Sequence, residues 1–550
     1  MPSVTPAWED VALKRREELA SQLDSYGYSL PTVSTKATNV KTVSLEGVLS
    51  AEELAITESS VEELVDNLAT GKLSSEAVTR AFCHRAVIAH QLTNCINHVF
   101  FEKALTRAKE LDAEFAKTGK PTGPLHGLPV SLKNQVNVKD EPMDLDYVGW
   151  VGRISPHNAV LVDCLLQQGA VLYCLTNMPQ ALFSGESVNN LYGRTVNPVN
   201  TNLASGGSSG GEGALITMRG SVLGVGSDLG GSIRIPAAFN GLYGFRPSYN
   251  RIPYGQSTNS QEGQEAVPSV LGPLTTDISG LKLFFKSVID AQPWNADPLA
   301  LRMPWNEAAY QLADHGEGKG PLVFGMMRHN GVVRPNPPYE RALEMAKKAL
   351  EAQGHKVIDY VIPDAAEGSK LLVGIYLADG GVDVDTECAT SGEPNLGGVL
   401  KGVKPEHLTT YQFWQHCYAR RKYITKQLAA WQATKELTGT GRPIDAIITP
   451  PAPYVSFEHG HKQDIYYTGF CNLNDYPAIV LPVTTVDLAV DVQVPAYEYS
   501  SDFDKLCHER YDPALYADMP VALQVIAKKG EDEAVLKMAE IVDAALKAAK

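Results

Sequence analysis

The most informative segment of this chain reads Gly224-Val-Gly-Ser-Asp-Leu-Gly-Gly-Ser-Ile-Arg-Ile-Pro236. It follows a second glycine-rich run, Ala204-Ser-Gly-Gly-Ser-Ser-Gly-Gly-Glu-Gly213. Residues without side chains let neighbouring backbone N–H groups turn toward one point at no steric cost. Acyl transfer needs a nucleophile, a base and N–H donors for an oxyanion. The hydroxyl of Ser232, preceded by two glycines, makes this segment a candidate site for such chemistry.

Two other functions of the glycine-rich runs have weaker support. A Walker loop needs a lysine after its glycines, which is absent here, and the glycines of 224–230 are spaced one residue too widely for GxGxxG. Residues 206–210 do match the GxSxG nucleophile elbow, but the preceding stretch does not read as the strand that such an elbow follows. The late histidines that would complete it, His459, His461 and His508, have no supporting context.

The base that a serine nucleophile requires is missing from both glycine-rich runs. A candidate stands earlier, at Lys133, directly after the apolar run 128–132. This run reads as a buried strand, and burial disfavours the charged form of an amine. A desolvated lysine has a lowered pKa and can accept a proton. The chain therefore contains the elements of a Ser-Lys acyl-transfer site.

Short apolar runs alternate with helical patterns from about residue 125 onward. The runs predicted as buried strands are 128–132, 170–175, 222–225, 322–325, 446–449 and 478–481. Helical patterns lie between them, for example at 159–168 and 339–353. Strands that alternate with helices are typical of an α/β fold with a parallel or mixed sheet.

The first part of the chain has a different, helical character. Residues 7–24 have helical spacing, and Ser50 with Glu53 and Ser60 with Glu63 match the capping-box pattern at a helix start. We therefore predict an N-terminal helical arm over residues 1–60 and one large domain over residues 61–550.

The motifs of this chain resemble those of the amidase signature family. The similarity is specific in three places: Gly127-Leu-Pro-Val-Ser-Leu-Lys133, Gly206-Gly-Ser-Ser-Gly-Gly-Glu-Gly213 and residues 226–236. It extends to 176–180, 193–198, 445–450 and 520–526, and so covers nearly the whole chain from about residue 60. The arm, the length and Ser391-Gly-Glu-Pro394 most resemble the fungal acetamidase branch. The resemblance implies a large, mixed, twisted sheet with helices on both faces.

The resemblance also implies a Ser-cisSer-Lys triad. Ser232 is then the nucleophile, and Ser208, in a cis peptide, relays a proton between Ser232 and Lys133. The implied oxyanion donors are the N–H groups of Leu229, Gly230, Gly231 and Ser232, with Asp228, Arg234 and Ser209 supporting them. The implied pocket contains Leu182, Phe183, Gly206 and Gly207. No metal or organic cofactor is required.

The chain departs from the family pattern after its lysine. Family members usually carry an acidic residue there, whereas this chain has Asn134 and then an acidic loop at 140–146. Loss of the neighbouring carboxylate favours neutral Lys133. Because the family has this loop near the site entrance, we expect Asp144 and Asp146 at the substrate pocket, where they favour a cationic or polyhydroxylated substrate over acetamide. The alternatives are a solvated loop or acids that raise the lysine pKa.

Composition excludes several classes of protein. The chain has 48 basic and 63 acidic residues, a net charge of −15, which argues against a nucleic-acid or anionic-membrane binder. No apolar run of about 18 residues appears, so we predict no membrane span. Its 8 cysteines form no CxxC pair. Such sparse cysteine suits a reducing compartment and predicts a cytoplasmic location.

These observations together predict hydrolysis of a small-molecule amide, at a C–N bond other than a peptide, through an acyl-enzyme. Three alternatives stay open: biosynthetic acyl transfer or amide formation on the same acyl-enzyme, the transamidating subunit of a tRNA-dependent amidotransferase, and a non-catalytic binding protein that retains the fold. A homodimer is implied by the resemblance only.

Overall fold

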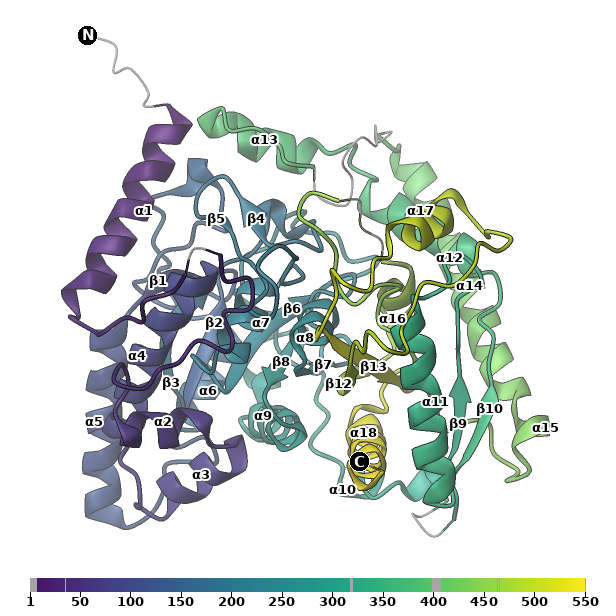
Figure 1. The fold of residues 1–550 in the computed structure, drawn as a ribbon, viewed down its shortest axis with the longest axis horizontal. Helices are drawn as coiled ribbons and strands as arrows, with labels where there is room; N and C mark the ends of the chain where they lie inside the picture. The colour runs from purple at the N-terminus through teal and green to yellow at the C-terminus, as the bar shows by residue number, and fades with distance from the viewer. Residues whose placement is uncertain are drawn as a thin grey trace.

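The computed structural model describes residues 7–34, 36–316, 320–397, 407–461, 463 and 465–549. Within these residues, 11 strands form one sheet that runs through the middle of the molecule (Figure 1). Their order in space is β1 (Ile96–Val99), β3 (Val171–Thr176), β2 (Pro129–Lys133), β6 (Leu223–Asp228), β8 (Val270–Thr275), β7 (Tyr243–Arg246), β12 (Ala478–Thr485), β13 (Pro520–Ile526), β11 (Ala446–Thr449), β9 (Val323–Met326) and β10 (Lys356–Asp359). A separate ribbon pairs β4 (Val188–Asn189) with β5 (Gly193–Arg194).

The sheet is mixed. β2 pairs in parallel with β3 and β6, whereas β6 pairs antiparallel with β8. Toward the other end, β9 lies parallel to β10 and β11. Each of the six apolar runs predicted as strands overlaps one of these strands. The predicted α/β fold with a large mixed sheet is confirmed.

Helices cover both faces of the sheet. The α-helices are α1 (Trp8–Ser25), α2 (Ala51–Glu58), α3 (Val61–Ala69), α4 (Ser75–Thr93), α5 (Phe101–Thr118), α6 (Val160–Gln167), α7 (Gly210–Thr217), α8 (Arg234–Asn240), α9 (Ile278–Asp290), α10 (Glu307–Tyr310), α11 (Pro337–Ala352), α12 (Ala365–Tyr376), α13 (Val382–Ser391), α14 (Thr410–Ala433), α15 (Lys435–Thr438), α16 (Tyr466–Asn474), α17 (Asp502–Arg510) and α18 (Asp532–Ala548). Short 3-10 turns lie at Val148–Trp150, Gln180–Leu182, Pro293–Asn295 and Ala313–His315. In the part of the chain that the structure describes, no helix is both long and apolar enough to cross a bilayer.

The two faces can be told apart along β13. Val521, Leu523 and Val525 belong to the large core cluster that includes residues of α11 and α18, whereas Ala522 packs with residues of α8. Successive side chains of a strand point to opposite faces. Therefore α11 and α18 cover one face, and α8 covers the other. Helices α12, α14 and α15 lie beside β9 and β10 (Figure 1).

The N-terminal helix packs onto the body of the protein. Leu19 and Leu23 of α1 belong to a buried cluster that also contains residues of α4 and α5. Arg16 anchors the helix, because its side chain donates hydrogen bonds of 2.7 Å to the carbonyls of Asn190 and Leu191. The capping boxes predicted at Ser50 and Ser60 are both formed, at the starts of α2 and α3.

The sheet places the carboxyl ends of β2 and β6, which carry two of the predicted motifs, side by side. Lys133 is the last residue of β2 and Asp228 is the last residue of β6, and these neighbouring strands are parallel. Carboxyl ends of parallel strands meet at the same edge of a sheet, where ligands of α/β proteins commonly bind. The loop after β6 leads through Ser232 into α8, so Lys133 and Ser232 lie at the same edge of the sheet.

Candidate active site

Lys133 is fully buried, and its amine contacts two hydroxyl groups. Its Nζ lies 2.6 Å from Ser208 Oγ and 2.8 Å from Ser227 Oγ. Burial lowers the lysine pKa to about 7, although the charges of Asp228, Asp146 and Glu212 act in the opposite direction. An amine with such a pKa is about half in its neutral form near pH 7, and the neutral form can accept a proton.

Ser227, which sequence reasoning did not single out, orients this amine. Its hydroxyl makes a short hydrogen bond to the Gln135 carbonyl Oε1. Because its proton points to Gln135, Ser227 Oγ is left to accept an N–H from Lys133. The lone pair of a neutral amine is then free for Ser208. Ser227 lies within the quoted segment 224–236 and Gln135 lies two residues after Lys133, but nothing in their spacing indicates this contact.

The peptide bond between Gly207 and Ser208 is cis. Close packing on both sides explains the two glycines that precede the serine. A Cβ on Gly207 would lie 2.4 Å from the Ser184 carbonyl oxygen, and one on Gly206 would lie 2.8 Å from Pro236 Cα. Gly206 also has a φ of +84°, which L side chains rarely adopt. Side chains at either position are therefore excluded.

Ser209 joins the two glycine-rich runs. Its N–H donates to the Ser232 carbonyl at 3.2 Å, and its Oγ accepts from the Ser227 N–H at 3.3 Å. It is completely buried. Ser209 thus holds the segment that carries Ser208 against the loop that carries Ser232, which places the two predicted catalytic serines in adjacent segments.

The loop after β6 presents N–H groups to a cavity. Leu229, Gly230 and Ser232 all line this cavity, and no hydrogen bond among the described residues uses their N–H groups. The fourth predicted donor, Gly231, differs, because its N–H donates to Asp228 Oδ1 at 2.9 Å. The prediction that Gly231 contributes a free donor is therefore corrected: its N–H fixes the loop instead.

Asp228 and Arg234 form a fully buried ion pair below this loop. Arg234 Nη2 and Nε lie 2.9 Å and 3.0 Å from the two carboxylate oxygens of Asp228. Burial alone would raise the aspartate pKa, but the Arg234 charge and its hydrogen bonds lower it to about 2. The arginine also binds Gln524, Asn472 and the Thr468 carbonyl. The pair thus connects the loop to the opposite half of the sheet.

The cavity beside Ser232 is small, about 40 Å³. Its lining consists of Leu182, Phe183, Ser184, Gly185, Gly207, Leu229, Gly230, Ser232, Ile235, Tyr376 and Ile465. Of the residues predicted for the pocket, Leu182, Phe183 and Gly207 line it, whereas Gly206 packs behind them on Pro236. Most of the side chains are apolar, so the cavity suits a hydrocarbon group.

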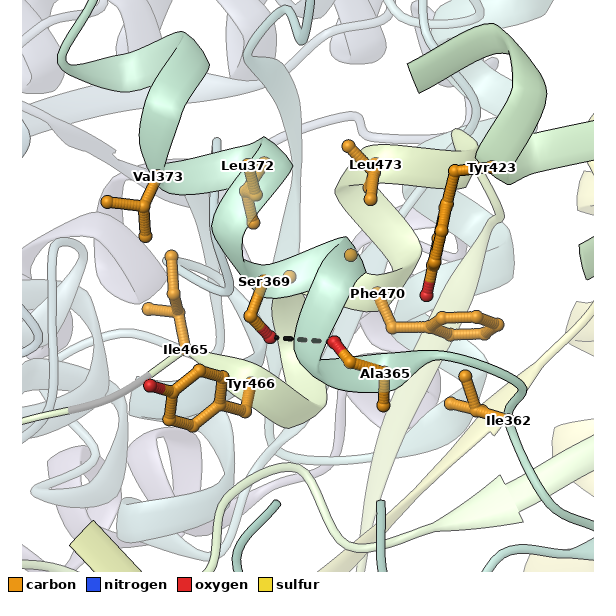
Figure 2. Close-up of a pocket in the computed structure, with 12 residues that line it drawn as sticks. Ile362, Ala365, Ser369, Leu372, Val373, Tyr423, Ile465, Tyr466, Phe470 and Leu473 are labelled. Atoms are coloured by element: carbon orange, nitrogen blue, oxygen red, sulfur yellow. Dashed lines mark hydrogen bonds between the residues drawn. The ribbon is translucent and has the colours of Figure 1, made fainter. Parts of the chain in front are cut away.

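Ile465 borders a second pocket as well. That pocket is about 20 Å³ and is lined mainly by apolar side chains of α12 and α16. Figure 2 shows Ile465 beside Val373 and Tyr466, on the side of the pocket away from Ile362. The Ile465 side chain therefore borders both the cavity at Ser232 and a second apolar pocket.

Comparisons with known proteins identify the family. The family model described as Amidase matches residues 77–536. The chain belongs to the amidase family. It is thus an amide-hydrolysing enzyme, and the resemblance inferred from its motifs is confirmed. The acetamidases of Aspergillus oryzae and Emericella nidulans are 41% and 40% identical to it, with 98% of this chain and 99% and 98% of theirs covered.

Solved structures show the same fold. A fatty acid amide hydrolase matches this amidase with a TM-score of 0.89 and 32% identity, over 98% of this chain and 95% of that chain. The peptide amidase of Stenotrophomonas maltophilia has a TM-score of 0.69 at 18% identity, over 89% and 97% of the two chains. The second likeness concerns the fold alone.

The acidic loop of this amidase does not reach the cavity. Asp144 and Asp146 are 2% and 0% exposed, and neither lines the cavity at Ser232. Asp146 accepts hydrogen bonds from Asn97, Asn134 and other amide groups. Asp144 accepts from Asn134 and from the Tyr192 hydroxyl. The expectation that these carboxylates meet substrate is corrected, since their oxygens are already bound inside the protein.

The histidines of the alternative nucleophile elbow have other partners. His459 uses one ring nitrogen on Glu186 and the other on the Thr201 carbonyl. His508 contacts Tyr499 and the Val494 carbonyl. Ser208 of this amidase is within hydrogen-bond distance of Lys133. The structure therefore gives no Ser-His pair at this motif within the residues described.

Asp228→Asn tests the ion pair under the loop. The variant leaves the Arg234 charge buried without compensation, so we expect the free energy of unfolding to fall by about 3–5 kcal/mol. Urea unfolding measures this loss. Asp290→Asn is the control, because it breaks the surface pair with Lys286, with side chains 43% and 44% exposed, and should change stability by less than about 1 kcal/mol. Equal stability losses in the two variants would contradict the bracing role.

Proposed function

We propose that this amidase hydrolyses a carboxylic amide through an acyl-enzyme on Ser232, with Ser208 as proton relay and Lys133 as base. The observation that carries the proposal is the 2.6 Å contact between the buried Lys133 Nζ and Ser208 Oγ. Ser232 lies on the cavity next to Gly207, the residue that precedes Ser208. Family membership supports the reaction class.

The first half of the reaction forms the acyl-enzyme. Neutral Lys133 accepts the Ser208 proton while Ser208 accepts the proton of Ser232, whose Oγ attacks the amide carbon. The carbonyl oxygen becomes an oxyanion beside the unused N–H groups of Leu229, Gly230 and Ser232. When the intermediate collapses, the C–N bond breaks and the leaving amine takes the proton back through Ser208.

The second half repeats these steps with water. Water loses a proton through Ser208 to Lys133 and attacks the acyl carbon. Collapse breaks the bond to Ser232 Oγ, releases the carboxylic acid and returns the proton to Ser232. Lys133, Ser208 and Ser232 thus end the cycle in the protonation states in which they began it.

We propose a small apolar acyl group for the substrate. The cavity of about 40 Å³ and its apolar lining support this size, as do the acetamidase names of the relatives. The argument against acetamide rested on Asp144 and Asp146 at the pocket. Their burial removes that argument, so a short aliphatic amide is the substrate class that we now favour.

We also propose the predicted division into an arm, 1–60, and an amidase domain, 61–550. A cytoplasmic location is supported by the 8 free cysteines. A homodimer has the family resemblance as its only support.

Labelling with a fluorophosphonate tests the nucleophile. We expect one covalent adduct on the wild type, none on Ser232→Ala, and labelling slowed at least about 100-fold in Ser208→Ala and Lys133→Ala, because each loses a proton-transfer group. Intact-protein mass measures the adduct, and circular dichroism checks the fold of each variant. An adduct that persists in Ser232→Ala but vanishes in Ser208→Ala would assign the other serine. A folded wild type without adduct would favour a binding protein.

The pH dependence of kcat/KM tests the base. Burial lowers the Lys133 pKa to about 7, so the amine is neutral and active above that pH and charged and inactive below it. We therefore expect kcat/KM for a short amide to rise with pH along a limb centred near 7. A flat profile between about pH 5.5 and 9 would contradict this assignment.

Ile465→Ala tests the size of the acyl pocket. The truncation joins the cavity at Ser232 to the second apolar pocket, so amides with longer acyl chains should gain about tenfold in kcat/KM relative to acetamide. Ile362→Ala is the matched control, because Ile362 lines only the second pocket. Similar acyl preferences in both variants would show that Ile465 does not limit chain length.

A further inference from the structure

The loop of residues 229–232, which we call the oxyanion loop, is held by hydrogen bonds to its carbonyl groups. The Leu229 carbonyl accepts a hydrogen bond from the hydroxyl of Tyr376, the last residue of α12. The Gly230 carbonyl accepts one from Thr468 Oγ1 of α16 at 2.6 Å. Two neighbouring carbonyl groups of the loop are therefore bound by hydroxyl groups of helices that are distant in the sequence.

The direction of a carbonyl group also fixes the direction of the N–H group in the same peptide. The peptide bonds of the oxyanion loop are trans, and in a trans peptide the C=O and N–H groups point in opposite directions. The peptide between Gly230 and Gly231 follows this rule. Thr468 binds its carbonyl, and its N–H donates to Asp228 Oδ1 at 2.9 Å. That peptide is therefore held at both ends.

The peptide between Leu229 and Gly230 is held at one end only. Its N–H is one of the three unused donors at the cavity and has no hydrogen-bond partner in the part of the chain that the structure describes. The Tyr376 hydroxyl on its carbonyl is therefore the one hydrogen bond that orients this peptide. Glycine gives little steric resistance to rotation of the peptide that precedes it. Loss of the hydroxyl would let the peptide turn its carbonyl oxygen toward the place where an oxyanion forms.

The other two unused donors are oriented by the backbone. The Ser232 N–H belongs to a peptide whose carbonyl accepts a backbone N–H at 2.7 Å in the turn into α8. The peptide that carries the Leu229 N–H begins at Asp228, the last residue of β6, which pairs with Val270 of β8. Of the three donors, Gly230 is thus the one whose direction depends on a single side-chain hydroxyl group.

Packing holds the Tyr376 side chain in place. The residue is 3% exposed and belongs to a buried cluster with Leu372 and Ile375 of the same helix. Its ring meets the Phe183 ring edge to face, with the centroids 6.1 Å apart. Burial raises the pKa of the Tyr376 hydroxyl above its ordinary value, so the hydroxyl keeps its proton and stays a donor. A buried hydroxyl on a fixed ring is a rigid anchor for a backbone carbonyl.

We propose that Tyr376 is a positioning residue, whose hydroxyl holds the Leu229–Gly230 peptide so that the Gly230 N–H faces the oxyanion. The inference rests on the proposed acyl-enzyme mechanism, in which this N–H stabilises the negatively charged oxygen. A donor that is aimed before the reaction stabilises the transition state without a cost of reorganisation. The ring of Tyr376 lines the cavity, but the proposed role belongs to its hydroxyl group.

Tyr376→Phe tests the inference, because it removes the hydroxyl and keeps the ring. We expect kcat for a short aliphatic amide to fall at least about tenfold and KM to stay within about twofold, since the lost stabilisation belongs to the transition state. An alkyl boronic acid forms a tetrahedral anion with a serine hydroxyl, so its Ki should rise by the same factor as kcat falls. Tyr511→Phe is the matched control, because its buried hydroxyl donates to the Asp491 carbonyl at 2.7 Å and does not line the cavity.

Thr468→Val distinguishes this one peptide from a general loosening of the oxyanion loop. The variant removes the hydroxyl from the Gly230 carbonyl but leaves Asp228 bound to the N–H of the same peptide. We therefore expect kcat to fall by at most about threefold, less than in Tyr376→Phe. Equal losses in the two variants would overturn the assignment of the effect to the Gly230 donor.

Two results for Tyr376→Phe would overturn the inference. One is a kcat and a boronic acid affinity that both stay within about twofold of the wild type. The other is a lower kcat with unchanged boronic acid affinity, which a purely structural role would give. Circular dichroism and urea unfolding check the fold of each variant against Tyr511→Phe. The proposed function is tested separately on the wild type, where the absence of a fluorophosphonate adduct at Ser232 would overturn both.

Discussion

Removing the Lys133 amine from water controls the chemistry of this site. A lone ammonium in the protein interior loses its hydration, so burial favours the neutral amine that a base requires. Three carboxylates oppose this effect, and the balance places the lysine pKa at about 7. Arg234 matters here because it neutralises Asp228, the carboxylate at the end of the neighbouring strand.

The glycines around the site serve packing as much as catalysis. A Cβ on Gly224 of β6 would lie 1.8 Å from Glu212 Oε2. Because Gly224 has no side chain, Glu212 of α7 can approach the sheet. There the hydroxyl groups of Ser131 and Thr176 donate to its carboxyl group at 2.5 Å and 2.9 Å. These contacts hold α7, and with it the segment of Ser208, against β2 and β3. The position of Ser208 thus depends on how closely α7 packs against the sheet.

Features with local causes could be predicted from the sequence. The strands are buried apolar runs, and the capping boxes at Ser50 and Ser60 need only four neighbouring residues. The acidic loop could not be predicted, because charged residues ordinarily lie at the surface and the donors that bury Asp146 come from distant segments, at Asn97 and Asn189. The hydrogen bond of the Gly231 N–H to Asp228 Oδ1 could not be predicted either, because spacing does not reveal which way a backbone N–H points.

The buried carboxyl pair of Asp144 and Asp146 shows how the residues that follow a motif can be drawn into the protein interior. Asn134 reads as a lost carboxylate, yet the amide donates to two acids that come back to the same place from ten and twelve positions further on. Pairwise electrostatics depends on distance and burial, not on sequence position. A buried acidic loop needs polar partners, and here these include Tyr192 and, through its hydroxyl, Arg15 of α1. The N-terminal helix is thus tied by polar contacts to the buried acidic loop.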